Sequence, residues 1–144
     1  MKEIDIANQL FLKKQFKDAI QKYDKILQIN SDNLIALNNK GYALTKLKRF
    51  EDALKCYDHS LKIHPNDKTV LINKISLFRK TGKITEALNL CDGLLKTYPD
   101  NLITLYHKLR LLKKLKKFEE SNDICNKILE IYPSNIEIQN ELIK

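Results

Sequence analysis

The sequence predicts an all-α protein, a solenoid of stacked antiparallel helix pairs. Three observations lead to this fold class. Pro65, Pro99 and Pro133 follow one another at intervals of 34 residues, and a fixed period of this size is typical of helical repeats. Apolar residues recur between these prolines at helical spacing. Glycine and proline are scarce, with three of each in 144 residues.

The segment 34–67 shows the repeating unit most clearly. Two apolar stripes at helical spacing predict two helices: Leu37, Gly41, Leu44 and Leu47, then Phe50, Ala53, Leu54, Tyr57, Leu61 and Ile63. Gly41 and Ala53 are small, so the two helix backbones can approach closely. Pro65 has no backbone N–H and ends the second helix, and Asp67 is placed to cap the next one. Such a pair cannot cover its own apolar surface and needs neighbours.

The same unit recurs once before this segment and twice after it. The columns in register are Phe16, Phe50, Ile84 and Phe118; Ala19, Ala53, Ala87 and Ser121; Leu27, Leu61, Leu95 and Leu129; and the expected helix caps Asn33, Asp67, Asn101 and Asn135. We expect helices near residues 2–14, 17–30, 35–48, 51–64, 68–81, 85–97, 102–115, 119–131 and 135–143.

Two departures from strict repetition have structural consequences. The turn between paired helices carries, at equivalent positions, Lys14, Lys48, Gly82 and Lys116. If this turn needs a positive φ, the lysines are strained, because glycine is the residue that adopts it freely. The place of Gly41 is taken by Ile75 and Leu109 in the third and fourth units. These larger side chains are expected to hold the helices of their pairs further apart.

The units resemble tetratricopeptide repeats, whose period is 34 residues and whose pattern ends in A-x3-F/Y and Pro. The matching residues of the clearest unit are Leu37 (at the usual Trp position), Gly41, Leu44, Ala53, Tyr57 and Pro65. The resemblance covers almost the whole chain, read as one domain of residues 1–144 with units 1–33, 34–67, 68–101 and 102–135 and a terminal helix over 136–144. It implies a right-handed superhelix whose first helices line a concave, peptide-binding groove. The last segment could also be where a longer repeat protein was cut.

Composition sets the broad class. The chain is 43% hydrophobic, enough for one domain with a substantial core, and its net charge of +8 suits an anionic partner. No apolar run is long enough for a membrane span, and the first residues do not resemble a secretory signal, so a cytoplasmic protein is expected. Cys91 and Cys125 occupy equivalent positions and are expected to be reduced and buried, whereas Cys56 is expected to be more exposed.

No motif indicates enzymatic chemistry. The three histidines form no HxxxH or HExxH pattern, and no Cys/His spacing resembles a zinc site. The three glycines are isolated, so no phosphate-binding loop is present. We therefore expect no catalytic residues, no metal and no cofactor.

The resemblance places a candidate peptide-binding groove on the first helices. Its residues would be Asn38, Asn39, Tyr42, Lys46, Asn73, Arg79, Lys80, Tyr106, Arg110, Lys113 and Lys114. The asparagines could hold an extended backbone, the tyrosines could stack on side chains, and the basic residues suit an acidic peptide. In the alternative interpretation the asparagines satisfy local hydrogen bonds and the basic residues form a solvated face.

The sequence also bears on three other kinds of partner. The Lys108–Lys117 region is rich in basic residues and could bind nucleic acid, although no regular polar code for reading bases is visible. A homodimer could form through a terminal unit, because end repeats leave apolar faces uncovered. The clamp by which chaperone-binding members of the family hold a terminal carboxylate is not expected, because its basic members are absent in both registers tried.

Overall fold

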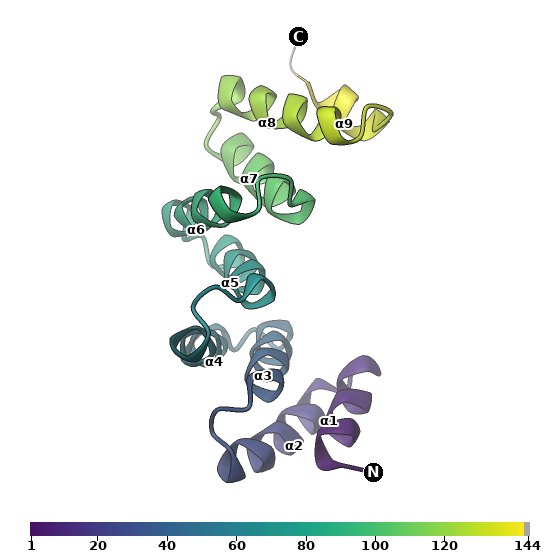
Figure 1. Cartoon of the computed structure of the whole chain (residues 1–144), viewed down its shortest axis with the longest axis vertical. Helices are drawn as coiled ribbons and strands as arrows, with labels where there is room; N and C mark the ends of the chain where they lie inside the picture. The colour runs from purple at the N-terminus through teal and green to yellow at the C-terminus, as the bar shows by residue number, and fades with distance from the viewer. Residues whose placement is uncertain (143–144) are drawn as a thin grey trace. The chain divides into compact units, whose positions relative to one another are not determined.

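The computed structural model describes residues 1–142, which form nine α-helices and no strand. The helices are α1 Glu3–Leu12, α2 Phe16–Ile29, α3 Leu34–Lys46, α4 Phe50–Ile63, α5 Lys68–Lys80, α6 Ile84–Thr97, α7 Leu102–Lys114, α8 Phe118–Ile131 and α9 Ile136–Glu141 (Figure 1). Each bound lies within two residues of its predicted position, which confirms the all-α prediction. The part of the terminal helix expected at residue 143 lies outside the described residues.

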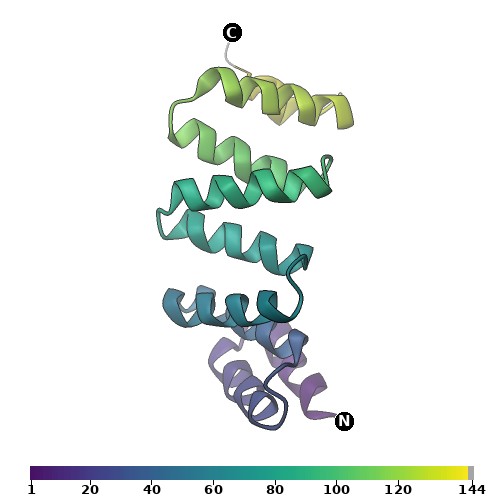
Figure 2. The ribbon, with the colours of Figure 1, turned by 60° about the vertical axis from the view of Figure 1, so that its left-hand side comes forward.

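The chain divides into two compact halves, Met1–Leu77 and Phe78–Lys144, and the division falls inside α5. In the N-terminal half, α1 packs on α2, α2 on α3 and α3 on α4. In the C-terminal half, α6 packs on α7, α7 on α8 and α8 on α9, an order that Figure 2 shows from a second direction. The grouping of four repeats into one domain stays a prediction.

Each half has its own apolar core. In the N-terminal half the core residues are Ile20, Ala43, Leu44, Ala53, Cys56, Tyr57, Val70 and Leu77, with a second cluster of Ala7, Ala19, Tyr23 and Ala36. In the C-terminal half they are Leu105, Leu109, Cys125, Ile128 and Ile138. Ile138 belongs to α9 and is fully buried. The last described helix therefore packs on the apolar face of the helix pair before it.

Close helix contact depends on the pairing of large and small residues. A Cβ added to Gly41 would lie 2.6 Å from Cε1 of Tyr57, which is only 1% exposed. In the fourth repeat the equivalent positions carry Leu109 and Cys125, and both belong to the core of the C-terminal half. The larger residue on the first helix is thus accompanied by a smaller one on the second. Size at this position alone does not indicate the spacing of a pair.

The turns between paired helices adopt a positive φ, the condition under which the sequence analysis expects strain at the lysines. The φ values are 60° at Lys14, 60° at Lys48, 77° at Gly82 and 58° at Lys116. In the second repeat Lys48 N–H donates to the carbonyl of Thr45, and Arg49 N–H donates to the carbonyl of Leu44. This is the Schellman arrangement, which satisfies the last carbonyls of a helix through one left-handed residue. Lysine replaces the preferred glycine in three of the four turns.

The predicted helix caps are confirmed. In each case a side-chain oxygen accepts a hydrogen bond from the backbone N–H three residues on. The pairs are Asn33 with Ala36, Asp67 with Val70, Asn101 with Thr104 and Asn135 with Ile138, at 2.9, 3.1, 2.9 and 3.1 Å. These caps satisfy donors that a helix start leaves unpaired, so they fix where α3, α5, α7 and α9 begin.

Ion pairs repeat at the same 34-residue interval. Lys40 pairs with Asp24 at 2.5 Å, and the equivalent pairs are Lys74 with Asp58 at 2.7 Å and Lys108 with Asp92 at 2.6 Å. Each pair joins the second helix of one repeat to the first helix of the next, across 16 residues of sequence. The lysine is the more buried partner, with 18–24% of its side chain exposed. The pairs therefore link successive repeats at equivalent positions.

All three cysteines are free and buried. Cys91 and Cys125 are fully buried, as predicted, and Cys56 is 8% exposed. Cys56 is thus more exposed than the other two, as expected, although its side chain still belongs to the core of the N-terminal half. Burial raises the pKa of all three thiols, that of Cys91 to about 12.

Candidate functional site

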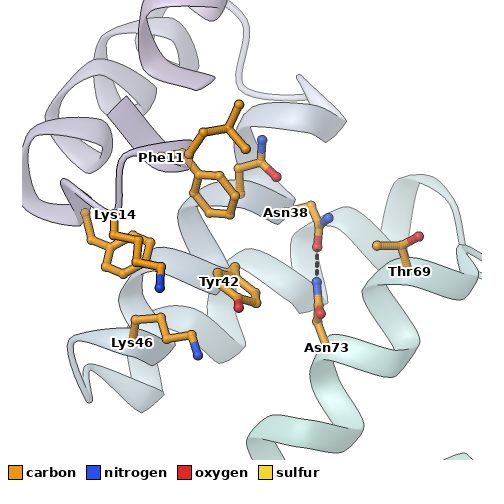
Figure 3. Close-up of a pocket in the computed structure, with 10 residues that line it drawn as sticks. Phe11, Lys14, Asn38, Tyr42, Lys46, Thr69 and Asn73 are labelled. Carbon is orange, nitrogen blue, oxygen red and sulfur yellow. Dashed lines mark hydrogen bonds between the residues drawn. The ribbon is translucent and has the colours of Figure 1, made fainter. Parts of the chain in front are cut away.

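The N-terminal half contains a cavity of about 610 Å³, here called the aromatic pocket (Figure 3). It is lined by Phe11, Leu12, Lys14, Phe16, Asn38, Asn39, Tyr42, Lys46, Thr69 and Asn73. These residues come from α1, the start of α2, α3 and α5, and from the turn that follows α1. The first helices of three repeats thus contribute to one surface. The volume is in the range of sites that hold a small ligand or one or two side chains.

One wall of the aromatic pocket consists of three rings in contact. The centroid of Phe11 lies 5.9 Å from that of Phe16 and 5.3 Å from that of Tyr42, both in edge-to-face geometry. Lys46 Nζ lies 5.2 Å from the Tyr42 centroid, a cation–π distance. Leu12 is 77% exposed beside these rings. This wall offers apolar contact area with cationic groups at its edge.

Asn39 is held inside the protein by its neighbours. Its Nδ2 donates to Asn8 Oδ1 at 3.0 Å and to the Tyr23 hydroxyl at 3.1 Å. The Tyr23 hydroxyl in turn donates to Asn8 Oδ1 at 2.6 Å. Burial raises the pKa of Tyr23, so its hydroxyl stays protonated and keeps donating. These three groups form a closed local network, so the amide nitrogen of Asn39 is engaged within the protein, as the local hydrogen-bond interpretation expected.

Asn38 and Asn73 are joined by a single hydrogen bond, which leaves part of each amide unused. Asn73 Nδ2 donates to Asn38 Oδ1 at 2.9 Å, shown as a dashed line in Figure 3. Among residues 1–142, Asn38 Nδ2 and Asn73 Oδ1 have no other side-chain partner. A donor and an acceptor thus lie side by side on the pocket wall. The C=O and N–H of a peptide backbone require this combination.

The C-terminal half contains a second cavity of about 340 Å³, here called the arginine pocket. It is lined by Arg79, Ile103, Tyr106, His107, Arg110 and Glu137. Arg79 belongs to the last turn of α5, Glu137 to the first turn of α9, and the others to α7. Arg79 Nη1 lies 3.1 Å from His107 Nδ1. The pocket therefore contains two guanidinium groups, one imidazole and one carboxylate.

Burial and the two arginine charges lower pKa values within the arginine pocket. Burial, with smaller contributions from Arg79 and Arg110, lowers the pKa of His107 to about 4. Burial and the nearby Arg110 also lower the pKa of Arg79. His107 is therefore neutral at pH 7, and each guanidinium lies in the field of the other.

The predicted site residues are distributed over these two pockets. Asn38, Asn39, Tyr42, Lys46 and Asn73 line the aromatic pocket, and Arg79, Tyr106 and Arg110 line the arginine pocket. Lys80 and Lys114 are exposed and line neither pocket. Lys113 Nζ is 2.7 Å from Glu141 of α9, so its charge is used within the protein.

Sequence reasoning did not single out Phe16, Lys14 or Glu137 as pocket residues. Phe16 looked like core because it follows the repeat register, yet its ring is half-buried and also faces the aromatic pocket. Lys14 lies in the left-handed turn after α1, and this turn places it in the lining of the aromatic pocket. The place of Glu137 in the arginine pocket depends on how α9 packs on the helices before it, which the repeat pattern does not indicate.

Two kinds of feature are absent from the part of the chain that the structure describes. No three side chains that could ligate a metal ion gather anywhere in residues 1–142. In the same residues, none of the helices combines the length and the apolar content that crossing a membrane requires.

Comparison with known proteins agrees with the fold. The tetratricopeptide repeat family model matches residues 35–67 and 103–135. Protein STIP1 homolog of Dictyostelium discoideum is 42% identical over 43 residues, which make up 30% of this chain and 8% of that protein. The matched segment is therefore a small part of that relative.

Solved structures resemble the chain over nearly its whole length. A tetratricopeptide repeat protein from Parabacteroides merdae has a TM-score of 0.89 at 22% identity, covering 96% of this chain and 56% of that one. MamA from Desulfovibrio magneticus RS-1 has a TM-score of 0.87 at 17% identity, covering 97% of this chain and 79% of that one. This chain thus spans about half the length of the first structure.

Helix pairs in series, with two pockets built largely from first helices, define a helical-repeat scaffold for protein–protein interaction. The chain belongs to the tetratricopeptide repeat family, as the matched residues and the shared fold show.

Proposed function

We propose that the chain binds a peptide segment of a partner protein in the aromatic pocket, and that this segment carries acidic residues. The observation that carries the proposal is the half-used amide pair of Asn38 and Asn73 beside three aromatic rings. A peptide group could accept from Asn38 Nδ2 and donate to Asn73 Oδ1. Its neighbouring side chain would lie against Phe11, Tyr42 and the exposed Leu12.

The preference for acidic residues follows from the charges near the pocket. Lys14 and Lys46 are exposed at its edge, and the whole chain has a net charge of +8. Exposed cations contribute little affinity to a single ion pair, but they accelerate the approach of an anionic partner. An apolar residue followed or preceded by Asp or Glu fits this surface best.

The test is a peptide-display selection with the wild-type chain, followed by affinity measurement on the enriched peptides. The double variant Asn38→Leu/Asn73→Leu removes the amide pair, and Asn126→Leu is a matched control on an exposed face of α8. Two lost hydrogen bonds, each contributing about 0.5–1.5 kcal/mol, should weaken binding about tenfold in the double variant only. Equal affinities for wild type and double variant would show that the peptide binds elsewhere.

The nucleic-acid alternative is less well supported by the structure. Within the Lys108–Lys117 region, Lys108 pairs with Asp92, Lys113 with Glu141 and Lys117 with Glu120. Charges that are paired within the protein are not available to replace the counterions of phosphates. We expect weak binding to random-sequence RNA with a shallow salt dependence. A steep one would favour the alternative.

Two further expectations stay predictions, namely a cytoplasmic location and a homodimer formed through a terminal repeat. Sedimentation velocity at several protein concentrations would test the second.

The charge-reversal pair Arg110→Glu and Lys114→Glu, compared with wild type in affinity capture, tests whether basic residues outside the aromatic pocket also select the partner.

A further inference from the structure

The arginine pocket has more positive charge than the protein itself neutralises. Within residues 1–142, neither Arg79 nor Arg110 forms an ion pair. Most of the ion pairs in this part of the chain are instead formed by lysines. Glu137 lines the same cavity without pairing to either guanidinium. Two positive charges and one negative charge leave a net charge of about +1 in the cavity. One carboxylate would neutralise it.

The hydrogen bond between Arg79 and His107 determines the tautomer of the histidine. Arginine has only donors, so Arg79 Nη1 must donate and His107 Nδ1 must accept. The low pKa of His107 keeps the ring neutral at pH 7, and a neutral ring whose Nδ1 accepts has its hydrogen on Nε2. His107 therefore orients Arg79 through one nitrogen and retains a donor on the other.

Tyr106 adds a further donor. Its hydroxyl accepts a hydrogen bond from Asn135 Nδ2 at 2.7 Å. Asn135 is itself fixed, because its Oδ1 caps α9. The hydroxyl hydrogen of Tyr106 is left to donate to another group. The cavity thus combines two guanidinium groups, an imidazole N–H and a phenol O–H, and only Glu137 adds a charged acceptor.

We propose that the arginine pocket binds a single carboxylate group, carried by an Asp or Glu side chain of a peptide partner. Planar guanidinium groups match carboxylate geometry and bind it with paired hydrogen bonds. Glu137 disfavours a doubly charged phosphate, because the net charge would then be reversed. The peptide source rests on the proposed function, but the site itself is separate from the aromatic pocket. It also differs from the terminal-carboxylate clamp of the family, whose basic positions are not basic here.

The experiment uses acetate as the probe on the full chain at pH 6.5, with chloride at the same ionic strength as the reference. Side-chain NMR signals of Arg79 Nε–H, Arg110 Nε–H and His107 Nε2–H are followed during the titration. We expect saturable shifts with acetate and none with chloride. Arg79→Gln and Arg110→Gln should each weaken acetate binding at least tenfold, whereas Lys96→Gln, an exposed change on α6, should leave it unchanged.

The variant Glu137→Gln should change acetate affinity in the direction opposite to that of the two arginine variants. Removing a like charge near the bound anion should tighten acetate binding about fivefold. Equal responses to acetate and chloride, or a saturable response retained in Arg79→Gln and Arg110→Gln, would overturn the proposal. Tighter binding of inorganic phosphate than of acetate would overturn the carboxylate assignment. Because Asn38→Leu/Asn73→Leu should leave the acetate response intact, failure of this site is distinguishable from failure of the aromatic pocket.

Discussion

Gly41 and Gly93 both lie inside helices, but only Gly41 is required there. A Cβ at position 41 would lie 2.6–3.0 Å from the Tyr57 ring, whereas one at position 93 would meet nothing within 4 Å. Gly41→Ala should therefore destabilise the protein by about 1–3 kcal/mol through overpacking. Gly93→Ala should stabilise it by about 0.8–1 kcal/mol through helix propensity. Urea denaturation of both variants tests the pair, and a destabilised Gly93→Ala would contradict the comparison.

His107 gives the stability of the protein a dependence on pH. Its pKa is about 4 in the folded chain and 6.5 in the unfolded reference. Below pH 6.5 the unfolded chain takes up a proton that the folded chain does not, so stability falls as the pH drops from 6.5 toward 4. After discounting for solvent screening, the loss is about 1–2 kcal/mol.

The variant His107→Gln isolates this contribution. Its free energy of unfolding, measured at several pH values, should fall less steeply than that of the wild type over the same window. Carboxylates titrate in this range too, so the difference between the two curves is the informative quantity. Parallel curves would show that His107 is not the group responsible.

Residue roles were only partly predictable from the sequence. The resemblance to tetratricopeptide repeats, carried along the repeat register, placed Asn38, Tyr42 and Asn73 on one surface, because repeats put equivalent positions on equivalent faces. It left open which asparagines satisfy local hydrogen bonds, and it did not name Asn8 and Tyr23 as the partners of Asn39. Hydrogen-bond satisfaction depends on distances between side chains, which a repeat pattern does not specify.

At the scale of the secondary-structure element, the left-handed turns allow the free-energy cost of a positive φ to be measured without a change in side-chain packing. Lys48 adopts φ of 60° where Gly82 adopts 77°, and a Cβ at Gly82 would meet nothing within 4 Å. Only backbone conformation should therefore matter at either position. Lys48→Gly should stabilise by about 0.5–1 kcal/mol and Gly82→Lys should destabilise by a similar amount. Denaturation midpoints that move in the same direction would contradict this account.

The repeated lysine–aspartate pairs connect one helix pair to the next. A double-mutant cycle on Asp24→Asn and Lys40→Met should give a coupling energy of about 0.2–1 kcal/mol, because both groups remain partly exposed. The coupling should decrease as salt is raised. A coupling that is independent of salt would indicate packing of the lysine stem instead of charge.

Element boundaries were the most predictable feature, and the reasons are local. Prolines, cap residues and apolar stripes act over a few residues, so every helix bound lies within two residues of its expected place. The lysine–aspartate pairs were missed, although both partners repeat every 34 residues. The pairing of Lys113 with Glu141 had no sequence signal, because it depends on how α9 docks.

At the scale of the whole molecule, stability should be distributed along the chain. In repeat proteins the energies are approximately those of each repeat and its nearest neighbours. Gly41→Ala should therefore lower hydrogen-exchange protection in α3 and α4 more than in α7 and α8. A uniform loss of protection across all described helices would show that the chain unfolds as a single cooperative unit.

The three buried thiols offer a way to follow such openings without any introduced label. Cys56, Cys91 and Cys125 lie one each in α4, α6 and α8, and the reactive thiolate is disfavoured at each by burial. An alkylating reagent can therefore modify each sulfur only when its helix detaches from the core. The alkylation rates at the three cysteines, measured by mass spectrometry, would report how often α4, α6 and α8 open locally.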